Sequence, residues 1–243
     1  MAERRSVACV TGVSRGLGAA LAAELLQRGW EVVGLGRRAD AALAGPRFRL
    51  VVTDLADLGP LDGLARSTFE DLAALAPTRA VLVNNAAVAG PVGALGTLEA
   101  RELADALAVN LAAPLLLANA FVRAFAGRCA SRVIHVSSGL AVRALPAAGA
   151  YCVAKAGLEM AAAVGAAEAP QDVVTVVVRP GIVDTPMQSF LRSQPAARLP
   201  DVAIFADFHA SGRLQTAQAT ARWLADRAVE GDVANGTVLS YPQ

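Results

Sequence analysis

The stretch Ser6–Arg28, SVACVTGVSRGLGAALAAELLQR, sets the expected fold class of this chain. Its first part, Ser6–Thr11, is a continuous run of small and β-branched residues, which predicts a strand buried on both faces. Glycines recur within Thr11–Gly18, and the helical pattern Ala19–Arg28 follows. Glycines between a strand and a helix permit a tight turn, so a pyrophosphate can approach the N–H groups at the helix N-terminus. This order predicts a dinucleotide-binding unit, and the alternative is an ordinary glycine-rich turn.

The end of the next predicted strand, Glu31–Leu35, bears on the choice between NAD and NADP. In a dinucleotide-binding unit, a carboxylate near this point holds the ribose 2′-hydroxyl of NAD. Here the strand is followed by Gly36, Arg37 and Arg38, with no Asp or Glu at that place. Guanidinium groups suit phosphate, so Arg37, with Arg38 beside it and Arg15 in the glycine-rich turn, predicts a site for the 2′-phosphate of NADP(H). A solvent-exposed basic loop is the alternative.

Strand and helix patterns alternate along the rest of the chain. The other strands are predicted at 48–52, 80–83, 133–136, 172–178 and 236–241, and the other helices at 58–76, at 98–125 with a kink at Pro114, from Tyr151 onward, and at 216–229. This alternation predicts the α/β class: a single-domain, Rossmann-type, doubly wound parallel sheet of seven strands with helices on both faces. Residues 1–243 are expected to form that one domain. The segment at about 187–213, with scattered prolines and phenylalanines, is predicted to be a substrate flap with short helices.

Tyr151 and Lys155 are four residues apart at the head of a predicted helix, so their side chains share one face. A free tyrosine titrates near ~10. A nearby positive charge favours the phenolate and lowers the pKa, which suits acid–base catalysis at neutral pH. Ser138, after the strand at 133–136, is placed to donate a hydrogen bond to the same substrate oxygen. Taken alone, the pair is also compatible with an ordinary surface contact.

Composition excludes several kinds of partner. The chain has 243 residues and a formal net charge of +1, which gives no electrostatic case for nucleic acid or a membrane surface. No uninterrupted apolar run reaches the length of a membrane span, and the region from Ser6 is too strand-like for a signal peptide. Cys9, Cys129 and Cys152 lack paired spacing and are expected to be reduced thiols of a cytoplasmic protein. No cluster of metal ligands has usable spacing, so no metal is expected.

Six motifs together resemble the classical short-chain dehydrogenase/reductase (SDR) family, over essentially the whole chain. Each motif is weak alone, but all of them occur in the right order and spacing. They are TGVSRGLG at Thr11–Gly18, NNA at Asn84–Ala86, Asn110, Ser138, Tyr151 with Lys155, and PGIVDT at Pro180–Thr185.

The resemblance implies catalytic roles for four residues. Tyr151 would be the acid–base residue, and Lys155 would lower its pKa and hold the nicotinamide ribose. Ser138 would bind the substrate carbonyl. Asn110 would anchor a water that relays protons to Lys155.

A cofactor-binding set follows from the same resemblance. The backbone around Ile182, with Thr185, would hold the nicotinamide carboxamide, and Ser14 would lie beside the 2′-phosphate. Asp54 would contact the adenine ring or, as the sequence alone favours, cap the following turn. The full set comprises Gly12, Ser14, Arg15, Gly16, Leu17, Gly18, Arg37, Arg38, Asp54, Leu55, Asn85, Ala86, Tyr151, Lys155, Pro180, Gly181, Ile182, Val183 and Thr185.

Within the family, YCVAKAGLEM and RPGIVDTPMQSFLR look most similar to the sepiapterin reductase and benzil reductase branch, which reduces ketones and vicinal dicarbonyls. The resemblance therefore implies an NADPH-dependent carbonyl reductase acting on a small-molecule ketone or vicinal dicarbonyl, with Tyr151 as general acid. NADP-dependent oxidation of a secondary alcohol is one alternative. A non-catalytic dinucleotide-binding regulator on the same fold is another.

Two departures from the family pattern affect secondary expectations. Ala87 stands where the family usually has glycine, so the turn beside the cofactor is expected to follow a tighter or shifted path. The chain also lacks the usual Asp-Gly-Gly ending, which weakens the case for the common tetramer. A homodimer or homotetramer, formed through the helices near Leu98–Phe125 and Tyr151–Glu168, is expected by resemblance. His135 is expected to be a satisfied core histidine, whereas His209 lies in the predicted flap.

Overall fold

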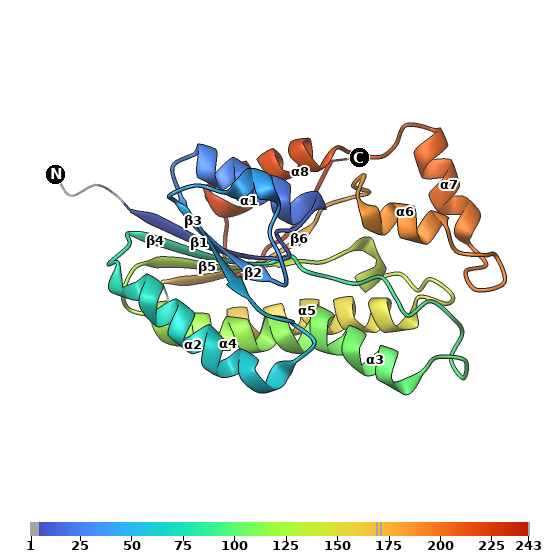
Figure 1. The fold of residues 1–243 in the computed structure, drawn as a ribbon, viewed down its shortest axis with the longest axis horizontal. Helices are drawn as coiled ribbons and strands as arrows, with labels where there is room; N and C mark the ends of the chain where they lie inside the picture. The colour runs from blue at the N-terminus through green and yellow to red at the C-terminus, as the bar shows by residue number, and fades with distance from the viewer. Residues whose placement is uncertain (1–4, 169, 171, 243) are drawn as a thin grey trace.

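Seven strands form one parallel sheet in the computed structural model, which describes residues 5–168, 170 and 172–242 (Figure 1). Their spatial order is β3-β2-β1-β4-β5-β6-β7, and every neighbouring pair is parallel. The predicted doubly wound Rossmann-type sheet is thereby confirmed. The outermost residues of the predicted domain, 1–4 and 243, lie outside the described part. The strands are β1 (Ser6–Thr11), β2 (Glu31–Gly36), β3 (Phe48–Val52), β4 (Arg79–Asn84), β5 (Ala130–Val136), β6 (Val173–Arg179) and β7 (Val238–Ser240).

Helices cover both faces of the sheet (Figure 1). Helices α1 and α8 pack side by side on one face, and α2, α4 and α5 lie on the other. The described helices are α1 (Gly16–Gln27), α2 (Leu58–Ala74), α3 (Ala100–Leu107), α4 (Ala113–Phe125), α5 (Gly149–Glu168), α6 (Pro186–Arg192), α7 (Val202–Ala210) and α8 (Ala217–Leu224), with short helical turns η1 (Ala41–Leu43), η2 (Ala108–Ala112), η3 (Gly139–Ala141) and η4 (Ala225–Val229).

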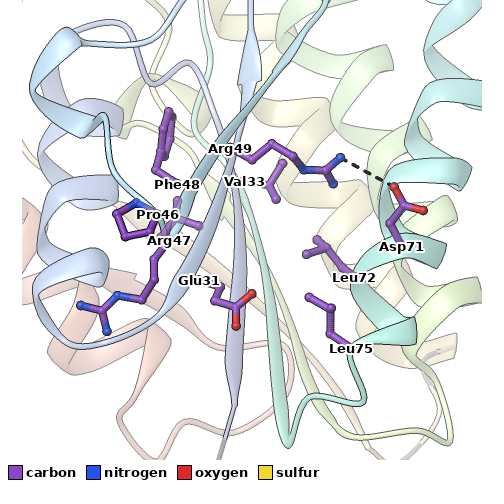
Figure 2. A pocket seen from close by; sticks show the side chains of 10 residues that line it. Glu31, Val33, Pro46, Arg47, Phe48, Arg49, Asp71, Leu72 and Leu75 are labelled. Carbon is purple, nitrogen blue, oxygen red and sulfur yellow. Dashed lines mark ion pairs between the residues drawn. The ribbon is translucent and has the colours of Figure 1, made fainter.

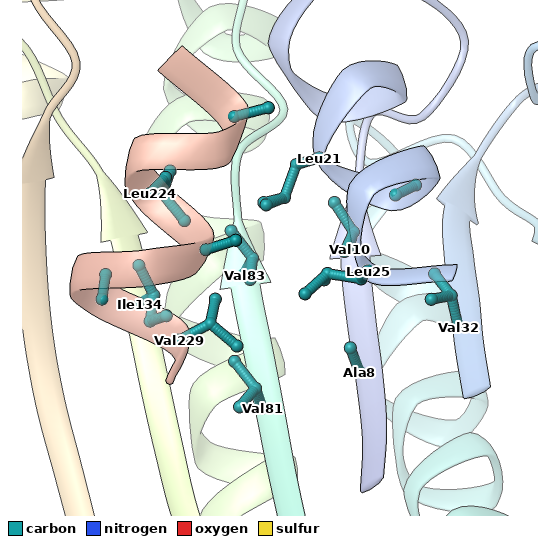
Figure 3. Packing of buried hydrophobic residues seen from close by; sticks show 14 of the residues in the cluster. Ala8, Val10, Leu21, Leu25, Val32, Val81, Val83, Ile134, Leu224 and Val229 are labelled. Atoms are coloured by element: carbon teal, nitrogen blue, oxygen red, sulfur yellow. The ribbon is translucent and has the colours of Figure 1, made fainter. Parts of the chain in front are cut away.

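The continuous apolar strands supply two cores, because successive side chains point to opposite faces. On one face, Val10 and Val83 pack with Leu21 of α1 and Leu224 of α8 (Figure 3). The other core joins odd-numbered β1 residues such as Cys9 to the aromatic cluster of α2 and α4. There, Phe69 meets Phe121 edge to face, with ring centroids 5.4 Å apart. The strands are thereby held from both sides, and the turns at their carboxyl ends rest on a rigid frame.

A π-helical turn interrupts the long helix predicted at 98–125. The helical stretch begins at Ala100, passes through η2 and ends at Phe125. The irregularity therefore lies just before Pro114, which occupies the first turn of α4. Proline has no N–H to donate to the preceding turn, and single π turns inside helices are frequent at functional sites.

The stretch Ala100–Phe125 also has the length and apolar character of a membrane span, with a mean hydropathy of 1.6 over its most apolar window. Core helices of soluble proteins meet the same criteria. Leu117, Phe121 and Phe125 on this helix are fully buried in the core beside the sheet. These buried side chains pack against α2 and the strands.

The segment predicted as a flap contains two short helices, α6 and α7, which stand at the carboxyl edge of the sheet (Figure 1). It carries a small core of its own. Leu191, Leu199 and Phe205 are buried there, together with Ala89 and Val92 from the segment after β4. The flap is therefore packed against the loop beside the strand ends.

Candidate active site

The glycine-rich turn after β1 leaves no room for side chains. A Cβ on Gly18 would lie 2.3 Å from both the Gly12 carbonyl oxygen and Asn85 Nδ2, and one on Gly12 would lie 3.0 Å from Ala86 Cα. Gly12 and Gly16 also have positive φ values of 74° and 61°, which favour glycine. This bare turn opens α1, as expected where a pyrophosphate meets backbone N–H groups.

Asn85 and Thr11 join the ends of β4 and β1 at the point where the strand order reverses. The Thr11 hydroxyl accepts hydrogen bonds from the backbone N–H groups of Asn85 and Ala86, both at 2.9 Å. The Asn85 side chain donates to the Thr11 carbonyl oxygen at 2.8 Å. In open α/β sheets, ligands bind in the crevice at such a switch point. Ala87 beside it has no positive φ value, so it adopts an ordinary backbone conformation without needing glycine.

Three arginines flank the turn on the side of β2. Arg15 is exposed before α1, and Arg37 and Arg38 are exposed after β2. Arg37 contacts Asp54 loosely, with 3.8 Å between Nη1 and Oδ2, and its side chain is 78% exposed. Asp54 itself accepts a hydrogen bond from the Ala56 N–H at 3.0 Å, which is the capping contact that the sequence favours. The arginine side chains thus retain most of their exposure and can meet an added phosphate.

Ser138, Tyr151 and Lys155 come together at the carboxyl end of β5. Ser138 follows that strand, its Oγ accepts from the Leu140 N–H at 3.2 Å, and its hydroxyl lies near enough to the Tyr151 phenol to lower the pKa of that phenol. Lys155 is 2% exposed, and its Nζ donates to the Val136 carbonyl oxygen at 2.7 Å. The same ammonium lies 5.6 Å from the centre of the Tyr151 ring. A phenol, a hydroxyl and an ammonium therefore share one space, as the spacing of the two helical residues predicts.

Burial dominates the titration of these groups. It raises the pKa of Tyr151 to about 12, and the hydrogen bond with Ser138 lowers it. The lowering of this pKa by Lys155, which the sequence predicts, remains a prediction. Burial lowers the pKa of Lys155 to about 8, and the negative charge of Glu159 opposes this shift. At neutral pH, Tyr151 therefore holds its proton and Lys155 is largely charged.

Asn110 lies fully buried in the π-helical turn η2. Its side chain pairs with the backbone of one residue: Nδ2 donates to the Val88 carbonyl oxygen and Oδ1 accepts from the Val88 N–H, both at 2.8 Å. The amide thereby holds the segment after β4 against the helix. The water relay expected by resemblance remains a prediction.

The segment after β6 approaches the glycine-rich turn. A Cβ on Gly16 would lie 3.2 Å from Thr185 Cγ2, so the two segments are in close reach. Gly181 has a φ of 75°. The backbone of Ile182 and Asp184 pairs with Gln215, through Gln215 N–H to Ile182 O at 2.8 Å and Asp184 N–H to Gln215 O at 2.7 Å. The structure thus brings the predicted nicotinamide-side residues, Pro180–Thr185, next to the predicted pyrophosphate-side turn.

The remaining sequence candidates are two histidines and three cysteines. His135 is buried, and its Nδ1 lies 3.3 Å from Asn84 Nδ2, as expected for a satisfied core histidine. His209 is exposed on α7. The cysteines Cys9, Cys129 and Cys152 are all free. No cluster of three or more His, Cys, Asp or Glu residues that could hold a metal occurs within the described part of the chain.

A hollow of about 320 Å³ lies elsewhere, between the start of β3 and helix α2 (Figure 2). Three of its four charged side chains are paired: Arg49 lies 3.6 Å from Asp71, and Glu31 lies 2.8 Å from Arg5. It is also remote from the carboxyl ends of the strands, where ligands of open α/β sheets bind. The hollow is therefore not the candidate active site.

Comparison with protein families agrees with this geometry. Residues 6–196 match the family model described as short chain dehydrogenase. The chain belongs to the short-chain dehydrogenase family. The resemblance drawn from the six motifs is confirmed, and the protein is an oxidoreductase of this family.

Named relatives of this short-chain dehydrogenase include two reductases. A benzil reductase from Bacillus subtilis, which forms (S)-benzoin, is 28% identical over 211 residues, covering 85% of this chain and 86% of that protein. A sepiapterin reductase from Meriones unguiculatus is 35% identical over 205 residues, covering 77% and 78% respectively. A solved short-chain dehydrogenase/reductase from Burkholderia vietnamiensis is 35% identical, with a TM-score of 0.70 over 80% of this chain and 94% of that one.

Two other solved relatives contain a nicotinamide cofactor. A putative NAD(P)-dependent gluconate 5-dehydrogenase from Beutenbergia cavernae, with bound NADP, is 25% identical, with a TM-score of 0.78 over 97% of this chain and 94% of that one. A 3-oxoacyl-acyl-carrier-protein reductase from Brucella melitensis, in complex with NAD, is 26% identical, with a TM-score of 0.79 over 98% and 96%. Short-chain dehydrogenases thus bind NAD or NADP on this fold.

Sequence reasoning did not single out three polar residues beneath the short-chain dehydrogenase site. Glu159 accepts hydrogen bonds from Ser137 and Arg179, and it faces Lys155. A signal was present, because Glu159 stands four residues after Lys155 and so shares its helix face. Ser137 and Arg179 gave no signal of their own, since their partner is distant along the chain.

Proposed function

We propose that this short-chain dehydrogenase is an NADPH-dependent carbonyl reductase that acts on a ketone or a vicinal dicarbonyl. The observation that carries the proposal is the meeting of Ser138, Tyr151 and Lys155 at the same edge of the sheet as the bare glycine-rich turn. The names of two relatives, benzil reductase and sepiapterin reductase, support the same chemistry.

The preference for NADPH is supported by charge at the end of β2. Arg37 and Arg38 are exposed there, and Arg15 is exposed in the neighbouring turn. NAD-binding sites of this fold place a carboxylate at that point to hold the ribose 2′-hydroxyl, and β2 is followed by none. A planar guanidinium pairs with phosphate through two parallel hydrogen bonds. Arg37 would exchange its loose contact with Asp54 for the 2′-phosphate.

In the proposed mechanism, the residues of this chain position the carbonyl and deliver a proton. The cofactor, when bound, supplies a hydride to the carbonyl carbon. Tyr151 donates its phenolic proton to the carbonyl oxygen, and the O–H bond of the product forms as the phenolic O–H bond breaks. Ser138 donates a hydrogen bond to the same oxygen and steadies the developing negative charge. Lys155, with its positive charge, stabilises the phenolate that remains.

Tyr151 carries the proton that the proposed reduction requires. Burial raises its pKa to about 12, so the phenol is protonated at neutral pH.

The flap is proposed to cover the substrate. Its apolar cluster of Leu191, Leu199 and Phe205 packs against Ala89 and Val92, which lie beside the strand ends. A predominantly apolar cover suits ketones with hydrocarbon or aromatic substituents. The segments that shape this pocket lie at 90–95, 140–145 and 187–213.

We also expect a cytoplasmic homodimer or homotetramer. Helix α5 presents Val153, Met160 and Val164 to solvent on one face, with exposures of 63%, 66% and 47%. Apolar side chains grouped on one helix face of a soluble protein mark an interaction surface. A twofold arrangement would bury these residues against the same helix of a second copy.

The test is oxidation of NADPH or NADH by the purified protein, followed by absorbance, with α-diketones, aryl ketones and pterin-like dicarbonyls as substrates. Turnover with NADPH is expected, and Tyr151→Phe should abolish it. Tight NADPH binding without turnover on any carbonyl would overturn the proposal and favour alcohol oxidation or a regulatory role.

Cofactor choice is tested by Arg37→Ala. Loss of a charge-assisted contact worth about 1.5 kcal/mol should weaken NADPH binding roughly tenfold and leave NADH binding unchanged. The matched control is Arg49→Ala, since Arg49 is also exposed but pairs with Asp71 at a distance from the site. A wild-type preference for NADH would remove the role given to Arg37.

A further inference from the structure

One carboxylate joins three elements beneath the candidate active site. Glu159 on α5 accepts a hydrogen bond from the Ser137 hydroxyl at 2.7 Å. It also forms a bidentate pair with Arg179, whose Nε and Nη2 donate at 2.9 and 2.6 Å. Ser137 follows β5, and Arg179 is the last residue of β6. The Glu159 side chain is only 15% exposed, so this pair is shielded from water far more than a surface ion pair.

Each contact of Glu159 lies next to a residue of the site. Ser137 stands between Val136, whose carbonyl oxygen accepts from Lys155, and Ser138, which contacts Tyr151. Arg179 immediately precedes Pro180 at the start of the predicted nicotinamide-side segment. A change at Glu159 would therefore be passed on to both halves of the site.

Glu159 also supplies the negative charge that faces Lys155. The titratable groups that bear on this ammonium are Tyr151 and Glu159 on α5 and His135 on β5, and Arg179 on β6 neutralises Glu159 in part. Burial and the charge of Lys155 hold the pKa of His135 at about 4, so that ring is neutral and supplies no charge at neutral pH. Burial lowers the pKa of Lys155, and Glu159 raises it.

We propose that Glu159 is a positioning residue for the proposed reduction: its carboxylate fastens α5 to the ends of β5 and β6 and provides the counter-charge for the buried Lys155. It acts through Lys155 and makes no contact with the substrate. The inference rests on the proposed function, because that function gives Lys155 its task.

The test compares four variants over pH 6 to 10: Glu159→Gln, Glu159→Asp, Arg179→Gln and Glu230→Gln. Two readouts are followed, the kcat for reduction of a diketone and the Kd for NADPH measured by fluorescence. Thermal unfolding reports the stability of each variant. Glu230 is the matched control, since it accepts from Arg28 and Trp30 at 2.7 and 3.0 Å in a network away from Lys155.

The variants have distinct expected signatures. Glu159→Gln keeps the shape of the side chain but loses its negative charge, which lowers the pKa of Lys155. The alkaline limb of the pH profiles of kcat and of the Kd for NADPH should therefore move to lower pH by about one unit. Arg179→Gln removes the positive charge that partly neutralises Glu159, so Glu159 raises the pKa of Lys155 further and the alkaline limb should move to higher pH. Glu159→Asp keeps the charge and should retain the limb near its wild-type position, even where stability falls. Glu230→Gln should lower stability without moving the limb.

A role in packing alone would lower kcat in Glu159→Gln and Arg179→Gln by the same factor at every pH, and this result would overturn the inference. Should Glu159→Gln fail to fold, an alkaline limb shifted upward in Arg179→Gln supports the inference, and an unmoved limb overturns it.

NADPH binding keeps the two proposals separate. If the alkaline limb of NADPH binding shifts in a protein without carbonyl turnover, the proposed function is refuted, and only the role of Glu159 as counter-charge for Lys155 stands.

Discussion

At the scale of single residues, Gly18 shows how closely the cofactor turn is built. The backbone oxygen of Gly12 and the side chain of Asn85 occupy the place of its missing Cβ. Because one of these atoms belongs to the backbone, a side chain here must displace the turn itself.

Gly18→Ala is therefore expected to destabilise the protein by about 1–3 kcal/mol and to weaken NADPH binding at least tenfold. Thermal unfolding and fluorescence titration would measure the two effects. The control is Gly63→Ala on α2, where a Cβ meets no atom within 4 Å, so helix propensity should raise stability by up to about 1 kcal/mol. Equal stabilities for the two variants would contradict this account of the turn.

His135 makes a second prediction at this scale, because burial and the charge of Lys155 lower its pKa to about 4. An unfolded histidine takes up a proton near ~6.5, whereas the folded one does so only near the lower value. The unfolded state thus binds more protons between these pH values, and stability falls as the pH drops through this window. Across this window, His135 is expected to lower the free energy of unfolding by about 3 kcal/mol as the pH falls.

His135→Gln should remove that part of the pH dependence of the free energy of unfolding, measured with urea at pH 4 and pH 7. The other histidine, His209, is exposed on α7. His209→Gln should keep the wild-type slope. A slope that survives in His135→Gln would show that other groups govern acid unfolding.

At the scale of elements, the flap is held by a core separate from the two cores of the sheet. Phe205 of α7 is 7% exposed, and its ring meets Phe208 edge to face at 6.1 Å. Helices α6 and α7 pack against each other and, through this cluster, against the segment after β4.

Phe205→Ala should raise the KM for the carbonyl substrate about tenfold and leave the Kd for NADPH nearly unchanged. Cleavage by protease within 193–213 should also become faster, because removal of a buried ring opens a cavity. Ile204→Ala is the control, since Ile204 is 43% exposed on the same helix. The same KM in both variants would show that the flap does not cover the substrate.

The π-helical turn η2 is the other element with a consequence for the site. It places Asn110 so that one amide side chain takes both backbone polar groups of Val88. Helix-propensity arguments expect asparagine to be disfavoured in a helix interior. Here the low helix propensity of Asn110 is offset by its two buried hydrogen bonds with Val88.

At the scale of the whole molecule, the exposed apolar face of α5 decides the expected assembly. Met160→Glu would place a charge in the middle of this face and should convert the oligomer to a monomer in analytical ultracentrifugation. Leu75→Glu, at the end of α2, is a control of similar chemistry away from α5. A wild-type protein that sediments as a monomer would contradict the expected homodimer or homotetramer.

Much of the fold follows from patterns that are local in the sequence. The buried run Ser6–Thr11, the glycines after it and the helix that follows predict the first unit because backbone preference depends on neighbouring residues. The spacing of Tyr151 and Lys155 places both on one helix face by geometry alone. Parallel strands in alternation with helices leave few topologies open, so seven strand patterns were enough to predict the doubly wound sheet.

Only the tertiary structure decided what these residues meet. Glu159 lies 22 residues from Ser137 and 20 from Arg179 along the chain, so no local pattern joins them. The upward shift of the Tyr151 pKa likewise follows from burial, and the phenol is buried only in the folded chain. Helix and strand patterns depend on near neighbours, whereas desolvation and long-range pairing depend on the whole fold.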